Sequence, residues 1–266
     1  MFTTNPFSIL AETVPPIGLQ SFVIVMVALV IIGTLVDIIH KKNVKYFFEN
    51  AKKAKLSATK TLSAGEKISV ISKTIVSDIA TTSELGAGKR RVAHLLGMYG
   101  TILFWIGSAI MIFCYSSPSS GTPSFWPIIW HVGAIMTVVG GSWFWFFLRV
   151  DVYSEAHPWY RIIKADLFVL ALITSSLFGL IWSCLQSLNL NDRWDDKAFL
   201  VLYIISNLAL FGGVYWSKFA HMFYKPGASI QKNLAEADGS RDNLPPPADV
   251  PEQYGLGIDR EKAKHY

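Results

Sequence analysis

The chain has 266 residues, of which 52% are hydrophobic and only 16% are charged, and its net charge is +5. Soluble domains carry about a quarter charged residues, so this composition excludes an ordinary soluble domain and indicates a membrane protein. Two cysteines, Cys114 and Cys184, are fewer than the roughly four thiolates that hold an iron–sulfur cluster, which excludes a cluster bound by this chain alone.

Five long apolar stretches follow a short polar lead, residues 1–16, which contains prolines. The first stretch, Ile17–Ile39, is too long for the apolar core of a signal peptide and has no basic residue before it. Each stretch is long enough to cross about 30 Å of hydrocarbon as a helix. The sequence therefore predicts an all-α fold, an integral membrane bundle of five transmembrane helices. The other four predicted spans are Val92–Tyr115, Trp126–Leu148, Ile162–Leu185 and Ala198–Phe223.

The distribution of basic residues predicts the orientation of the bundle. The connection of residues 40–91 holds 12 of the 24 Lys and Arg residues against 4 acidic ones, and the loop Arg149–Arg161 is basic at its edges. The loop Ser116–Phe125 has no charged residue, and Gln186–Lys197 is mostly acidic. Because basic loops stay in the cytoplasm, we expect the N-terminus outside and the C-terminus in the cytoplasm. The positive charge then serves topology and contact with the lipid bilayer, which argues against a nucleic-acid partner.

Two segments outside the spans carry patterns of their own. Within the basic connection, Val44–Leu56 predicts an amphipathic helix that lies in the membrane interface, with a solvated cytoplasmic helix as the alternative. Glu84–Arg91 predicts a glycine-broken turn before the second span. The tail, residues 227–266, has four prolines and little apolar content, so we expect it to be extended. A strap that docks a soluble partner and a plain disordered tail both fit this composition.

Histidines are the candidate metal ligands. His94 near the start of the second span and His221 near the end of the fifth are predicted at one depth on antiparallel helices. Two such imidazoles match a haem b that is held from both axial faces. The alternative is that these histidines form hydrogen bonds between helices or are hydrated. For the other membrane-associated histidines we favour that alternative, namely for His40, His131 and His157.

Other features near the predicted haem side have two interpretations each. Arg91 and Lys218 lie at the end where haem propionates would be, yet basic residues anchor that end in any case. Gly97, Gly100 and Gly107 leave a helix face without bulk, which suits either a flat cofactor or a neighbouring helix. The chain shows no phosphate-binding glycine loop, no HExxH and no Ser–His–Asp arrangement that can be placed. We therefore expect a redox or structural subunit with no catalysis of its own.

Three stretches carry a resemblance to a known family. RRVAHLLGMYG (Arg90–Gly100), Trp126–Val152 and SKFAHMFYKPG (Ser217–Gly227) resemble the gamma subunit of respiratory nitrate reductase and the membrane subunits of heterodisulfide-reductase-like and Qmo quinone-interacting complexes. The tail Ala235–Gly255 is similar to membrane anchors associated with adenylylsulfate reductase. The similarity covers about residues 90–255 and includes the four-helix membrane region predicted for residues 92–226.

The resemblance implies one haem b on the cytoplasmic side, with His94 and His221 as iron ligands and Arg91 and Lys218 near the propionates. It implies that electrons pass between a cytoplasmic adenylylsulfate reductase, with iron–sulfur and flavin subunits, and membrane quinone. The setting would be the inner (cytoplasmic) membrane in dissimilatory sulfur metabolism. Where the family holds a second haem, this chain has Phe104 and Tyr203, so the outer haem is expected to be absent.

Two competing hypotheses need no haem. One is a structural tether that docks a soluble enzyme through the tail and the basic connection. The other is a small transporter subunit, which would require internal repeats and broken helices. We see no repeat in the sequence, and Gly212–Gly213 is the one candidate break.

Overall fold

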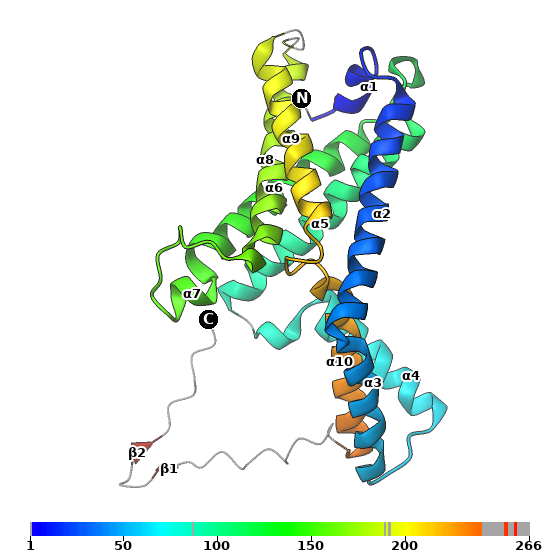
Figure 1. The fold of residues 1–266 in the computed structure, drawn as a ribbon, viewed down its shortest axis with the longest axis vertical. Helices are drawn as coiled ribbons and strands as arrows, with labels where there is room; N and C mark the ends of the chain where they lie inside the picture. Colours follow the sequence, from blue (N-terminus) through cyan, green and yellow to red (C-terminus); the bar gives the residue numbers. More distant parts are fainter. Residues whose placement is uncertain are drawn as a thin grey trace. The chain divides into compact units, whose positions relative to one another are not determined.

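The structure is a computed structural model that describes residues 2–240, except 87, 189 and 191–192, and two short strands beyond them. It divides into two compact units (Figure 1). Unit 1 comprises Met1–Asp37 and Val92–Ala220, and unit 2 comprises Ile38–Arg91 and His221–Tyr266. The regular elements of the described residues are helices, apart from β1 (Gln253–Tyr254) and β2 (Ile258–Asp259), which pair antiparallel.

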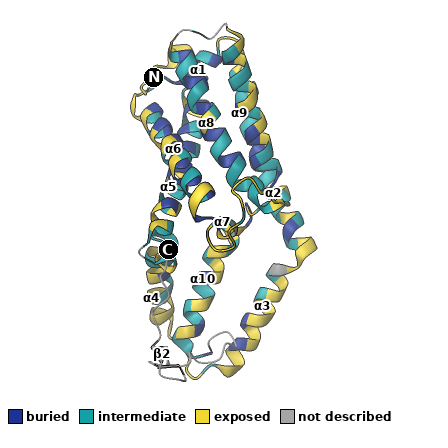
Figure 2. Cartoon of the chain, turned by 90° about the vertical axis from the view of Figure 1, so that its left-hand side faces the viewer, coloured by how far each residue is buried: buried dark blue, intermediate teal, exposed yellow. Residues whose placement is uncertain are grey.

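Four helices of the described residues are long and apolar enough to cross a membrane, which makes the chain a multi-pass membrane protein. They match the first four predicted spans to within a few residues. Few residues of α2 are buried (burial is coloured in Figure 2), as expected for a helix whose apolar surface faces lipid. The spans are α2 (Pro16–Lys41), α5 (Lys89–Cys114), α6 (Phe125–Trp143) with its π-helical continuation η5 (Phe144–Leu148), and η6 (Lys164–Asp166) with α8 (Leu167–Ser187).

The last apolar stretch differs from its prediction. The helix α9 (Trp194–Gly212) ends eleven residues before Phe223, and an irregular segment, residues 213–220, follows it. A Cβ on Gly213 would lie 2.7 Å from Leu167 Cδ2, so glycine lets the chain turn close against α8. The amides of Trp216 and Ser217 donate to the Gly213 carbonyl and close this turn. The prediction of one helix as far as Phe223 is therefore wrong, because a turn at Gly213 ends it.

Packing of α5 against α6 depends on the absence of side chains. A Cβ on Gly100 would lie 2.6 Å from the amide nitrogen of Thr137, and one on Gly133 would lie 2.5 Å from that of Phe104. A Cβ on Gly140 would lie 2.6 Å from the nitrogen of Gly97. Such distances mean that the two backbones touch along several turns, a contact that small residues permit in membranes. The α5 glycines were predicted to face either a flat cofactor or a neighbouring helix. At Gly100 the contact with a neighbouring helix is confirmed.

An aromatic core fills the half of unit 1 that contains the N-terminus. The ring of Phe104 lies 5.0 Å from that of Trp130, and Tyr203 stacks on Trp182 at 5.8 Å. The short helix α1 (Pro6–Leu10) adds Phe7, whose ring meets both tryptophans. All five side chains are buried, and they form one cluster with their apolar neighbours.

Helix α1 lies in the segment that the sequence analysis treated only as a polar lead. The Asn5 side chain accepts from the amides of Phe7 and Ser8 and donates to the Tyr115 carbonyl at 2.9 Å. Asparagine followed by proline is a recognised signal for the start of a helix, so this element was predictable. The cap fixes Phe7 in the aromatic core.

Unit 2 is built on three amphipathic helices. The predicted amphipathic helix Val44–Leu56 is present as α3 (Asn43–Ala54), followed by the 3-10 turn η1 (Lys55–Ser57), and its place in the membrane interface stays a prediction. Helix α4 (Ala64–Thr74) was not predicted, although Ser63 and Glu66 form a capping box at its start. The remaining elements are η2 (Ile75–Ala80), η3 (Ser83–Leu85) and α10 (His221–Asp238).

The expected extended tail is wrong for its first part, because residues 227–238 belong to α10, which packs against α4. The polar composition of this segment predicted an extended chain, but its small polar residues form specific hydrogen bonds to the basic connection. Of the remaining tail, residues 241–252, 255–257 and 260–266 lie outside the described part of the chain.

We predict that Gly100→Ala destabilises the protein, by about 1–3 kcal/mol, because its methyl group forces α5 and α6 apart. Gly97→Ala is the matched control, since a Cβ on Gly97 meets nothing within 4 Å. The measurement is thermal unfolding of the detergent-solubilised protein, followed by tryptophan fluorescence. Equal midpoints for the two variants would contradict the backbone contact.

Candidate functional site

The two predicted haem ligands occupy different elements and different units. His94 lies on α5 in unit 1, directly after Ala93, which is buried. His221 is the first residue of α10 in unit 2, so it does not lie within a membrane helix as expected. Both imidazoles are exposed.

The two predicted basic partners also divide between the units. Arg91 is half-buried in unit 2, and its Nε donates to the Thr81 carbonyl at 2.7 Å. This bond ties the start of α5 to the turn before it. Lys218 lies in the irregular segment of unit 1, and its side chain is exposed. Arg91 thus has a local structural contact that the sequence analysis did not anticipate.

His131 on α6 is fully buried and fixed at both ring nitrogens. Nδ1 lies 2.7 Å from the Pro127 carbonyl, and Nε2 lies 2.8 Å from Ser183 Oγ on α8. Because the carbonyl can only accept, Nδ1 carries the proton and the Ser183 hydroxyl donates to Nε2. The expected interhelical role of His131 is confirmed.

Phe104 and Tyr203 stand where the resemblance places the second pair of ligands in the family. Their rings are 6.4 Å apart at an interplanar angle of 74°. Trp130 lies between neighbouring helices in the same core, and its Nε1 donates to Ser108 Oγ at 2.8 Å. The chain fills this region with its own side chains.

A hydrogen-bonded network joins α10 to the basic connection within unit 2. Asn233 Nδ2 donates to Thr74 Oγ1 at 2.8 Å and to Asp78 Oδ2 at 2.7 Å. Ser229 donates to Glu84 at 2.7 Å, and the Lys225 ammonium pairs with the same carboxylate. We call these contacts the α10 network. No sequence pattern identified it, because its partners are about 140 to 160 residues apart.

The α10 network shifts the pKa values of its two carboxyl groups. The hydrogen bond from Ser83 is the largest cause that lowers the pKa of Asp78, with Asn233 and Ser77 adding to it. The hydrogen bond from Lys225 is the largest cause that lowers the pKa of Glu84, followed by that from Ser229. Both carboxylates are therefore held ionised. The network is a structural joint, and its acids are poor candidates for proton transfer near neutral pH.

The surface of unit 2 exposes apolar side chains among lysines. Tyr46 and Phe48 on α3 are exposed, as are Ile68 on α4 and Val76 on η2. Exposed apolar groups beside basic residues are typical of a surface that meets a membrane or another protein. Unit 2 therefore has the character of an interaction surface.

Asp196, in the first turn of α9, is a buried carboxyl group, only 3% exposed, and its Oδ1 has no hydrogen-bond partner among the described residues. Burial, and to a lesser degree the charge of Asp195, raise its pKa from 3.8 to about 6. It lies two residues before the predicted span, which begins at Ala198.

No known protein family, curated relative or solved structure matches this chain. Within the described residues, no group of three His, Cys, Asp or Glu side chains has the arrangement of a metal site. A haem with two axial histidines requires fewer ligands than such a group, so the His94 and His221 hypothesis stays a prediction.

We predict that Ser183→Ala destabilises the protein by about 1–3 kcal/mol, because the buried His131 Nε2 loses its donor. Ser187→Ala on the same helix is the control. The Ser187 hydroxyl donates only to the Ser183 carbonyl of its own helix, so its loss should cost much less. Thermal unfolding in detergent measures both effects. A larger effect at position 187 would contradict the interhelical role.

We predict that Asp196→Asn stabilises the protein at pH 8, by on the order of 2 kcal/mol. The raised pKa means that the folded state holds the proton more tightly than the unfolded state. The wild type therefore loses stability as pH rises from about 4 to 6, and the loss is complete above that range. The advantage of the variant should fade below pH 6 and vanish below about 4. The measurement is the unfolding midpoint of wild type and variant across this pH range, with Glu236→Gln at an exposed position as the control. A stability difference that does not change with pH would contradict the prediction.

Proposed function

We propose that the chain is a membrane anchor and electron-transfer subunit, which passes electrons between a cytoplasmic adenylylsulfate reductase and membrane quinone through one haem b. The proposal rests on the resemblance of three stretches of sequence and on the multi-pass membrane character of the chain. It places the protein in the inner (cytoplasmic) membrane, with the chain itself non-catalytic.

The observation that carries the proposal is the different treatment of the histidines. The chain buries His131 and satisfies both of its ring nitrogens, whereas the imidazoles of His94 and His221 are exposed. Imidazole nitrogens are the usual axial ligands of haem b, so the chemistry of these two residues fits the group. His94 and His221 would hold the iron, and Lys218 and Arg91 would face the propionates. A bound haem b supplies one-electron transfer between a two-electron partner and quinone.

We further propose that α9 is a fifth crossing, with the N-terminus outside and the C-terminus in the cytoplasm. The helix is about 28 Å long, and its acidic first turn, with Asp195 and Asp196, would lie at the membrane surface. The distribution of basic residues favours this orientation. The basic connection, which lies entirely in unit 2, would then be on the side of the soluble partner.

A second candidate is a haem-free tether that docks a soluble enzyme. The observation that favours it is the α10 network, which gives unit 2 a defined fold with exposed apolar and basic side chains. His221, the first residue of α10, then binds no iron. This candidate needs no cofactor.

We predict a b-type difference spectrum, dithionite-reduced minus oxidised, for the purified full chain expressed with ample haem. His94→Ala and His221→Ala should each abolish it, because a six-coordinate haem b needs both axial ligands. His157→Ala is the control, since its imidazole lies in a loop beside Glu155.

Loss of the spectrum in both ligand variants, with the control unchanged, would establish the haem. A wild type without haem would exclude the electron carrier and leave the tether. A spectrum that survives both substitutions would assign the haem to other ligands.

A further inference from the structure

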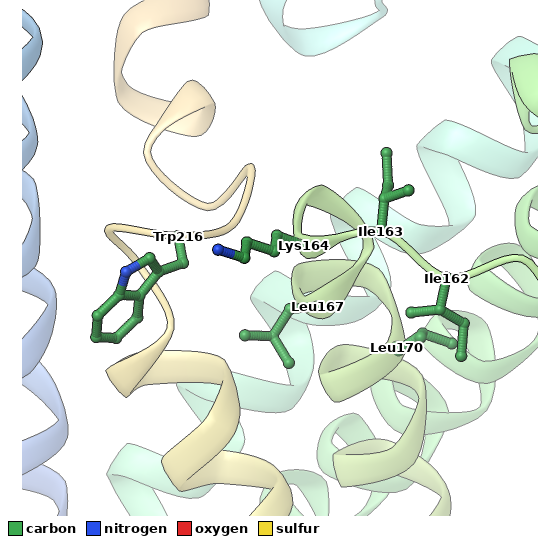
Figure 3. A pocket seen from close by; sticks show the side chains of 6 residues that line it. All are labelled: Ile162, Ile163, Lys164, Leu167, Leu170 and Trp216. Carbon is green, nitrogen blue, oxygen red and sulfur yellow. The ribbon is translucent and has the colours of Figure 1, made fainter.

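A groove of about 550 Å³ opens at the start of the η6–α8 span (Figure 3). One wall is the segment that leads into α8, and the other is the turn after α9. All six lining residues belong to unit 1. They are one lysine, one tryptophan and four aliphatic residues: Ile162, Ile163, Lys164, Leu167, Leu170 and Trp216.

A buried ion pair fixes the first wall. Arg149 is 5% exposed, and its guanidinium donates to Asp166 Oδ2 at 2.6 Å and to the Arg161 carbonyl at 2.8 Å. The Asp166 carboxylate also accepts from the Ile163 amide at 3.0 Å. The Arg149 guanidinium lies 4.0 Å over the Trp145 ring. These contacts hold residues 161–164 in place, so the groove is preformed on this side.

The turn at Gly213 forms the second wall. Because Gly213 packs directly on Leu167, the chain bends close to α8 before it reaches Trp216. Figure 3 shows Lys164 extending toward the indole of Trp216 across the mouth of the groove. The indole is 61% exposed and Ile162 is 64% exposed. Large apolar groups so exposed at the end of a span are expected where acyl chains cover them.

The charge at the groove mouth is positive. Lys164 belongs to no ion pair among the described residues, and the neighbouring carboxylate of Asp166 is already paired with Arg149. An ammonium beside an indole, above aliphatic walls, matches a molecule with an anionic head and an apolar tail. Lysine and tryptophan at a membrane boundary contact headgroups in this way.

We propose that this groove binds an anionic phospholipid, with its phosphate at the Lys164 ammonium and its acyl chain along Leu167 and Leu170. The Trp216 indole covers the glycerol region. The site is independent of the haem hypothesis, since neither His94 nor His221 contributes to it. It would fasten the turn between α9 and α10 to the start of α8.

The test compares phosphatidylglycerol with phosphatidylcholine added to the purified full chain in detergent. Thermal unfolding reports the stabilisation, and native mass spectrometry counts the lipid that stays bound. Phosphatidylglycerol should raise the midpoint clearly more than phosphatidylcholine does. Lys164→Gln should weaken phosphatidylglycerol binding about tenfold, because it removes a charge-assisted hydrogen bond. Trp216→Ala should weaken binding of both lipids.

Matched controls lie at the other end of α9, where Lys197 and Trp194 are also exposed. Lys197→Gln and Trp194→Ala should leave lipid binding unchanged. Equal stabilisation by the two lipids, or wild-type preference in Lys164→Gln, would overturn the proposal. The alternative outcome is that a short-chain quinone stabilises the protein, in a way that depends on Trp216, while phosphatidylglycerol has no effect. That result would assign the groove to quinone and overturn the lipid proposal.

Discussion

Unit 1 depends on the direct contact between the backbones of α5 and α6. Gly100, Gly133 and Gly140 place peptide groups of one helix against the other, where any Cβ would collide. In lipid the hydrophobic effect gives little drive for helices to associate, so close van der Waals packing of this kind supplies much of the specificity. The contact also fixes which residues of α5 face inward. Phe104 is buried in the aromatic core, whereas His94 is exposed.

Polar side chains within unit 1 follow from the same constraint. Once α6 is seated, His131 can reach Ser183 on α8, and the Trp130 indole can reach Ser108 on α5. Such bonds satisfy groups that would otherwise be costly in hydrocarbon. The histidine that is deepest in the fold is thus the one committed to structure. His94 and His221 are exposed, as is His40.

Unit 2 has a different physical basis. Its helices are amphipathic, and its joint is the α10 network of amide, hydroxyl and carboxylate groups rather than a large apolar core. The lowered pKa values of Asp78 and Glu84 indicate that these bonds favour the ionised carboxylates. A polar joint of this kind leaves apolar residues such as Phe48 and Ile68 at the surface. That surface is what both the electron-carrier and the tether hypotheses would use.

Sequence alone determined the four membrane helices and the amphipathic α3. Apolar length and helical periodicity are local properties, so no knowledge of neighbours was needed. The interhelical role of His131 was also anticipated, since a buried membrane histidine needs a partner, although only the fold identified Ser183. The tertiary structure decided the end of α9, because the Gly213 turn depends on Leu167 of another helix.

Tertiary structure also decided the fate of the tail and of the glycines. Residues 227–238 read as polar and unstructured, yet they form a helix because α4 and the turn after it supply partners about 150 residues away. Gly100 suited either a cofactor or a helix, and only the position of α6 distinguishes them. Composition and periodicity describe a segment by itself. Where a residue can serve two structural roles, the neighbouring element that packs against it determines which role it has.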